Sequence, residues 1–90
     1  MKAIVTVLGK DRVGIIASVC ALLSEHNINI LDISQTILEQ GYFTMVLLVD
    51  ISACTVPFPE IADRLEAYGT ERALAVRIQR EDAFNAMHRI

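Results

Sequence analysis

The order of hydrophobic and polar positions along the chain predicts its fold. Apolar, β-branched runs predict four strands, at about residues 2–8, 28–38, 42–51 and 72–80. Apolar residues at helical spacing predict two helices, at about residues 13–25 and from Pro57 or Pro59 to Tyr68. The buried stripe of the first helix is predicted to include Ile16, and Gly69 is predicted to follow the end of the second. The element order is therefore βαββαβ.

This order predicts an α+β sandwich of two layers. With right-handed crossovers, the strands form one four-stranded antiparallel sheet and both helices pack on one face, which is a split βαβ or ferredoxin-like arrangement. The first and third predicted strands are apolar on both sides, so the helix-free face is expected to expose one set of apolar residues, either Ile4, Leu8, Val46 and Leu48 or the residues that alternate with them. Since 53% of the residues are hydrophobic, we expect a homodimer or a larger assembly to cover such surface.

A short polar turn separates the first predicted strand from the first predicted helix. It reads Gly9-Lys10-Asp11-Arg12-Val13-Gly14 and leads into Ile15-Ile16. A strand-turn-helix junction presents unpaired backbone N–H groups, which favour an anion. Asp11 is also suited to cap the helix by accepting the N–H of Val13 or Gly14, a role compatible with ligand binding. The Lys-Ser/Thr pair of a phosphate loop is replaced by Ile15-Ile16, so nucleotide binding is disfavoured.

Composition and charge argue against several classes of function. A net charge of −3 lacks the basic excess needed for direct nucleic-acid binding. Because neither a secretory leader nor a run of roughly 20 apolar residues is visible, we expect a cytoplasmic protein without membrane contact. Cys20 and Cys54 lack metal-type spacing and are expected to be free thiols, and His26 is expected to be exposed at a helix end. With no catalytic set, we expect neither an enzyme nor a cofactor.

Four segments together make the chain resemble an ACT domain, a module that senses small molecules. The resemblance is carried by residues 9–14, by Asn27-Ile28-Asn29-Ile30, by Ile33-Ser34-Gln35-Thr36 and by Gly41-Tyr42-Phe43-Thr44-Met45. The resemblance spans essentially all ninety residues, with residues 1–80 as the ACT domain. The chain is similar in particular to stand-alone ACT proteins related to the glycine cleavage system repressor. The resemblance implies a homodimeric regulatory protein that binds an amino acid or a similar small metabolite, in metabolic or transcriptional regulation.

The resemblance also implies where the ligand binds. In ligand-binding ACT domains the site lies at the turn between the first strand and the first helix, and is often completed across a dimer interface by the start of the second strand. The implied ligand-binding residues are Gly9, Asp11, Arg12, Val13, Gly14, Ile15 and Asn29. Backbone N–H groups at the helix start suit a carboxylate, and Asp11 suits an ammonium group. Val13 stands where amino-acid-sensing relatives often carry proline, so the particular amino acid does not carry over.

Residues 81–90 form a C-terminal tail beyond the predicted domain. Glu81-Asp82 can start a short helix that carries Phe84 and Met87 on one side and ends at Ile90. We expect this tail to pack on the domain or on a partner, because such apolar residues are not left in water. The alternative function is a ligand-free protein-interaction module that regulates an enzyme or a transcription factor. A third reading is a detached regulatory part of a metabolic enzyme, such as a folate-dependent deformylase.

Overall fold

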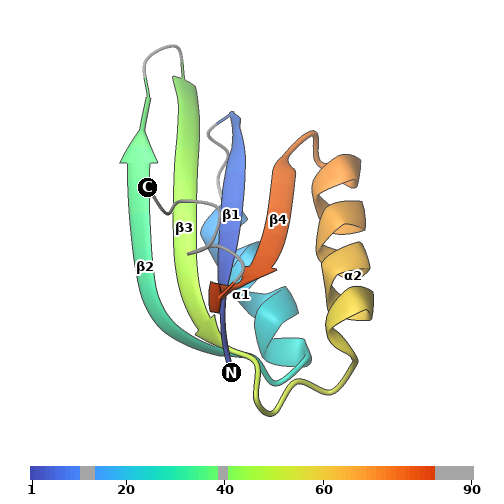
Figure 1. The fold of residues 1–90 in the computed structure, drawn as a ribbon. Coiled ribbons are helices and arrows are strands. Elements are labelled where there is room, and N and C mark those ends of the chain that lie inside the picture. The colour runs from blue at the N-terminus through green and yellow to red at the C-terminus, as the bar shows by residue number, and fades with distance from the viewer. Residues whose placement is uncertain (11–13, 39–40, 83–90) are drawn as a thin grey trace.

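The computed structural model of the protein describes residues 1–10, 14–38 and 41–82. Its elements are β1 (Lys2–Lys10), α1 (Ile15–Glu25), β2 (Asn29–Ile37), β3 (Tyr42–Asp50), α2 (Phe58–Glu71) and β4 (Ala75–Arg80). The strands form one antiparallel sheet in the order β2-β3-β1-β4, and both helices lie on the same face (Figure 1). The predicted βαββαβ sandwich is therefore confirmed.

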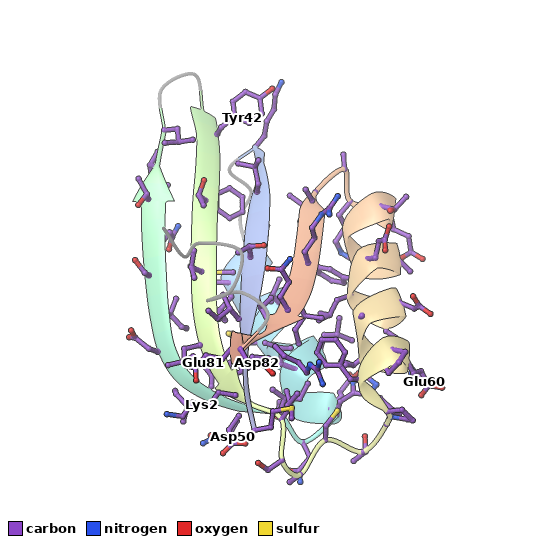
Figure 2. All side chains as sticks on the ribbon, viewed as in Figure 1. Lys2, Tyr42, Asp50, Glu60, Glu81 and Asp82 are labelled. Atoms are coloured by element: carbon purple, nitrogen blue, oxygen red, sulfur yellow. The ribbon has the colours of Figure 1, made fainter. Side chains whose placement is uncertain are left out.

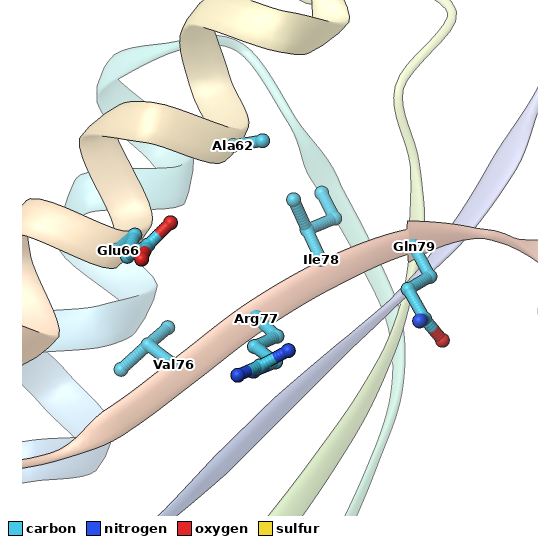
Figure 3. Close-up of a pocket in the computed structure, with 6 residues that line it drawn as sticks. All are labelled: Ala62, Glu66, Val76, Arg77, Ile78 and Gln79. Atoms are coloured by element: carbon cyan, nitrogen blue, oxygen red, sulfur yellow. The ribbon is translucent and has the colours of Figure 1, made fainter.

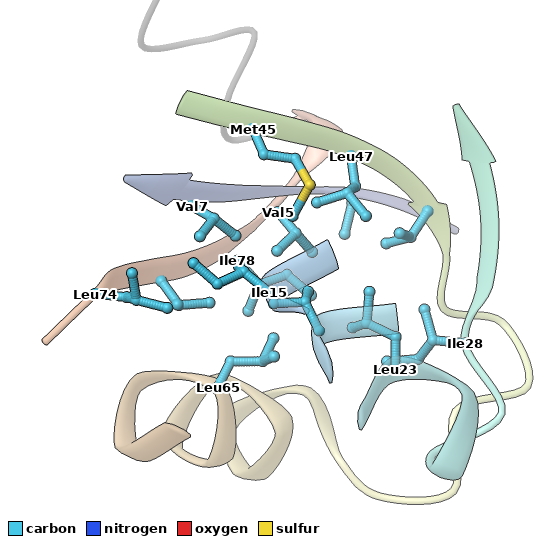
Figure 4. Close-up of a cluster of buried hydrophobic side chains, with 14 of the residues drawn as sticks. Val5, Val7, Ile15, Leu23, Ile28, Met45, Leu47, Leu65, Leu74 and Ile78 are labelled. Atoms are coloured by element: carbon cyan, nitrogen blue, oxygen red, sulfur yellow. The ribbon is translucent and has the colours of Figure 1, made fainter. Parts of the chain in front are cut away.

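The core fills the space between the sheet and the two helices (Figure 4). Alternate residues of the two central strands point into it and are fully or almost fully buried: Ala3, Val5, Val7, Phe43, Met45, Leu47 and Val49. Ile15, Val19 and Leu23 of α1 pack against them. Ile16 was predicted to belong to this stripe, but it is 39% exposed. The prediction is wrong because α1 begins at Ile15, whose side chain takes the buried position.

The end of α2 also differs from the prediction. Gly69 was expected to lie just past the helix, but α2 continues through it to Glu71 and β4 starts only at Ala75. Gly69 is buried where the helix meets the strand. A Cβ atom at this position would lie 2.6 Å from the Leu74 carbonyl oxygen and 2.8 Å from Val76 Cγ2. This glycine therefore permits close packing of helix and strand instead of terminating the helix.

His26 is buried, which corrects the prediction of an exposed cation at the end of α1. Only 7% of its surface is exposed, and its Nδ1–H donates to the carbonyl oxygen of Leu22 at 3.0 Å. The loop between β3 and α2 is bonded to this corner, since the Thr55 N–H donates to the His26 carbonyl at 3.0 Å and the Asn27 side chain donates to the Ala53 carbonyl at 3.2 Å. The backbone around His26 is thus held by residues far along the chain.

The strand β2 forms one edge of the sheet and is the least covered of the four. Its side chains are exposed except for that of Ile30, which is half-buried. The ladder with β3 shifts between Ile30 and Asp32, so Leu31 bulges out of the regular alternation. Beyond the bulge, Ile33 and Ile37 share the helix side of the sheet with Leu47 and Phe43 yet remain 42% and 57% exposed. This edge leaves apolar side chains open on the helix side.

Three further expectations concern the cysteines, membrane spans and the C-terminal tail. Cys20 and Cys54 are half-buried free thiols, as predicted. Within the described ranges, no helix is long and apolar enough to cross a membrane. The predicted tail falls mainly on residues 83–90, which lie outside the described residues.

Candidate ligand site at the β1–α1 turn

The turn predicted to bind a ligand lies at one end of the sheet, between Lys10 of β1 and Ile15 of α1. Asp11, Arg12 and Val13 lie outside the described residues. Gly14 occupies the N-cap position of α1 with a φ of 85°, in the left-handed region that favours glycine. The cap position expected for Asp11 therefore belongs to Gly14, and the helix begins two residues later than predicted.

The start of α1 is suited to an anion. The Ser18 N–H donates to the Gly14 carbonyl at 2.9 Å, which is the first bond of the helix. The N–H groups of the three residues before Ser18 have no acceptor inside the helix, and the first turn carries no acidic side chain that would compete for them. Ile15 itself is 6% exposed, so only its backbone can meet a ligand. The positive end of the helix dipole adds to the attraction for a carboxylate.

Gly9 packs closely against the residue that leads into β4. It is buried in β1, and a Cβ atom on it would collide with the side chain of Leu74, which follows α2. Its ladder partner in β3 is Phe43. Gly9 thus lies at the correct end of the sheet for the predicted site, but it can contribute only backbone atoms to a ligand.

Asn29 lies at the opposite end of the sheet from the turn. Its ladder partner is Asp50, which also pairs with Lys2, whereas Gly9 pairs with Phe43. Figure 2 shows the two ends, with Tyr42 labelled at one and Lys2 and Asp50 at the other. The separation between Phe43 and Asp50 along β3 amounts to ~23 Å at the rise of a strand. A single protomer therefore does not bring Asn29 to the turn.

Comparison with known proteins identifies the family. The sequence profile of the ACT domain matches residues 3–70. The chain belongs to the ACT domain family. ACT domains are generally regulatory, ligand-binding modules, which is the class of protein that the resemblance predicted.

Relatives of this ACT protein share its full length. A UPF0237 protein of Listeria innocua is 51% identical over 90 residues, which are all of this chain and all of the relative. The ACT domain protein from Streptococcus pneumoniae is 42% identical, with a TM-score of 0.81 over 93% of both chains. A crystal structure described as a glycine cleavage system transcriptional repressor shares the fold, with a TM-score of 0.72 and 23% identity over 88% of this chain and 44% of that one.

Two residues of the ACT domain that the sequence reasoning did not assign to the site lie beside the turn. Lys10 and Tyr42 are ladder partners, and Lys10 Nζ lies 5.9 Å from the centroid of the Tyr42 ring. Tyr42 is 41% exposed, so both groups are accessible at this end of the sheet. The lysine adds a positive charge at this end of the sheet. Recognising the pair requires the register of β1 against β3, which the periodicity of the sequence does not provide.

Several hollows are lined by described residues elsewhere on this ACT domain. One of about 210 Å³ runs between α2 and β4 and is lined by Ala62, Glu66, Val76, Arg77, Ile78 and Gln79 (Figure 3). Another, of about 270 Å³, lies near Ile51 and Cys54. Neither includes a residue next to the turn. Within residues 1–10, 14–38 and 41–82, no group of three His, Cys, Asp or Glu residues is placed to hold a metal ion.

Proposed function

We propose that this ACT protein is a homodimeric regulatory module that binds an amino acid or a similar small polar metabolite at the β1–α1 turn. Asn29 of the partner subunit completes the site. The observation that carries the proposal is the placement of an open helix start at one end of the sheet, together with an exposed β2 edge that a second copy can extend.

The turn supplies groups for both ends of an amino acid. The free N–H groups at the start of α1 and the Lys10 ammonium suit the carboxylate. Asp11, which follows Lys10 directly, supplies the carboxylate that an α-ammonium group requires. The amide of Asn29, which both donates and accepts hydrogen bonds, is then available to bind the side chain of the ligand.

The edge of β2 supports dimerisation. It is nine residues long, contains neither proline nor lysine, and carries a single charge, Asp32. Natural proteins usually protect such an edge, because its unpaired backbone groups pair readily with another strand. Ile33 and Ile37 are exposed beside it, and α1, in contact with β2, contributes the exposed Ile16. A second copy that pairs its β2 antiparallel to this one covers all three side chains.

This pairing also places Asn29. If the two-fold axis passes near Ile33, the middle of β2, then Asn29 of the partner subunit lies opposite Ile37. Ile37 pairs with Phe43, and Phe43 pairs with Gly9 beside the turn. Three interstrand spacings then separate the partner's Asn29 from Gly9, ~14 Å between Cα atoms. That gap accommodates a small ligand and its side-chain contacts, whereas the ~23 Å within one protomer does not.

Calorimetric titration with each of the twenty amino acids, alongside sedimentation equilibrium, tests the proposal. We expect one or a few amino acids to bind saturably to a dimer, and Asn29→Ala to weaken that binding at least tenfold. Gln35→Ala removes an exposed amide from the same strand and serves as the matched control. The ligand part is refuted if no amino acid gives heat or a thermal shift, and the dimer part if the protein sediments as a monomer.

The alternative is an interaction module that binds a partner protein and no ligand. It is favoured by the apolar side chains exposed along the β2 edge, such as Ile33 and Ile37, which suit a protein partner. On this alternative, recovery of a defined partner is unaffected by Asp11→Ala. Loss of that partner in the Asp11→Ala variant, together with amino-acid binding by the parent protein, selects the sensor.

A further inference from the structure

The sheet face opposite the helices has an apolar centre. The strand pairing shows which of its residues are neighbours: Ile4 pairs with Leu48, and Thr6 pairs with Val46. These four residues are half-buried, and Leu8 beyond them is 47% exposed. Charged residues stand around this centre, at Lys2, Lys10, Asp32, Asp50 and Arg77. We call Ile4, Thr6, Leu8, Val46 and Leu48 the open face, because α1 and α2 both lie on the other side of the sheet (Figure 1).

The chain leaves the sheet next to the open face. Arg80, the last residue of β4, pairs with Ala3, and Gln79 pairs with Ile4. Ile4 is therefore one interstrand spacing from the end of β4, and Leu48 is two, about 5 and 10 Å. The backbone of Glu81 and Asp82 is already helical. The next residues thus begin beside the largest apolar side chains of the open face.

The sequence of the following eight residues matches that surface. Phe84, Met87 and Ile90 recur at intervals of three, which places them along one side of a helix. Asn85, His88 and Arg89 are polar. Eight residues of helix extend about 12 Å, close to the distance from β4 across β1 to β3. The apolar stripe is therefore long enough to cover Ile4 and Leu48 together.

We propose that residues 83–90 cover the open face of their own protomer. The occupant is the chain's own tail and not a second copy, because attachment next to the surface gives the tail a high effective concentration there. A second copy pairs instead along β2, as under the proposed function. With this face covered, the proposed dimer does not assemble further, since two apolar sheet faces would otherwise stack. This proposal needs neither a ligand nor the β2 pairing.

Cross-linking of the full chain tests the proposal directly. In a background with Cys20→Ser and Cys54→Ser, Leu48→Cys is combined in turn with Phe84→Cys, Met87→Cys and Ile90→Cys and treated with a short bismaleimide. We expect at least one pair to link within a single chain, seen as a monomer of altered mobility on a denaturing gel. The matched control places the first cysteine at Glu66 on the exposed side of α2, where no intrachain link is expected. Links only between chains, or none, overturn the proposal.

Removal of residues 83–90 gives a second, independent readout. We expect a severalfold rise in the fluorescence of a dye that binds apolar surface, a lower melting temperature, and assemblies larger than the dimer in sedimentation. Asn85→Ala, a change on the polar side of the tail, is expected to leave all three unchanged. A deletion variant that matches the parent in dye binding, melting temperature and assembly refutes the proposal. If the deletion variant does not fold, the cross-linking result decides.

Discussion

The substitution Gly69→Ala tests the packing of α2 against β4. In an exposed helix this change stabilises by about 1 kcal/mol, because alanine has the better helix propensity. Here the new methyl group would lie 2.6 Å from the Leu74 carbonyl oxygen and 2.8 Å from Val76 Cγ2. Overpacking of this kind costs about 1–3 kcal/mol. The upper half of that range applies because the carbonyl oxygen belongs to the backbone and cannot rotate away.

The net expectation is a loss of about 1–2 kcal/mol in the free energy of unfolding. For a domain of this size, each kcal/mol lowers the melting temperature by about 4–8 °C. Urea unfolding at one fixed protein concentration measures the loss, because stability of a dimer depends on concentration. Thr70→Ala, at the neighbouring exposed position, is the matched control and is expected to be close to neutral. A Gly69→Ala variant as stable as the parent would refute the account of this glycine.

Three further predictions concern the edge, the site and one carboxylate. Ile33→Asp is expected to convert the dimer to a monomer in sedimentation equilibrium, whereas the control Ala67→Asp on α2 leaves the dimer intact. If both variants remain dimers, the β2 edge is not the dimer interface. Lys10→Met is expected to weaken amino-acid binding about tenfold, as loss of one charge-assisted contact does, and equal binding in calorimetry contradicts its role. Hydrogen bonds from the side chain and then the backbone N–H of Ser52 lower the pKa of Asp50, so Ser52→Ala should raise that pKa toward its ordinary value in an NMR titration.

The direction of the Asp50 pKa shift determines the pH range in which this carboxylate stabilises the fold. Since the folded pKa is lowered, the stability that this carboxylate contributes is present above its unfolded pKa of about 3.9. It is lost as the pH falls through the folded value. The Asp50 side chain is 40% exposed, so the NMR titration of its carboxyl group, and not acid unfolding, is the sensitive measurement. An Asp50 pKa that is identical in the parent and in Ser52→Ala would show that the hydroxyl has no part in the shift.

The fold was predictable because each element carries its own periodicity. The alternation in β3 and the helical spacing in α1 are local signals, and together with the chirality of the crossovers they leave few arrangements. Two of the errors share one cause. His26 accepts a hydrogen bond from the backbone of Thr55 in a later loop, and Gly69 is required by a strand that follows it. In both cases the role of the residue depends on a contact distant in sequence.

The candidate site was predictable only in part for the same reason. The turn is a local motif, and Gly14 in it adopts the left-handed conformation that a glycine permits. The position of Asn29 depends on the sheet register, which places it at the far end of its own protomer. The pairing of Lys10 with Tyr42 depends on the same register. The structure therefore changed the question from which residues form the site to which subunit supplies each of them.

Mixing two inactive variants tests the shared site most directly. Asp11→Ala and Asn29→Ala homodimers each lack one half of both sites, but a heterodimer of the two has one site with both residues intact. After exchange of subunits at equal concentrations, random pairing restores about one quarter of the sites, and calorimetry should detect binding at the parent affinity with that stoichiometry. If both residues acted within one protomer, no mixture would recover binding. A mixture as inactive as its components would therefore contradict the account.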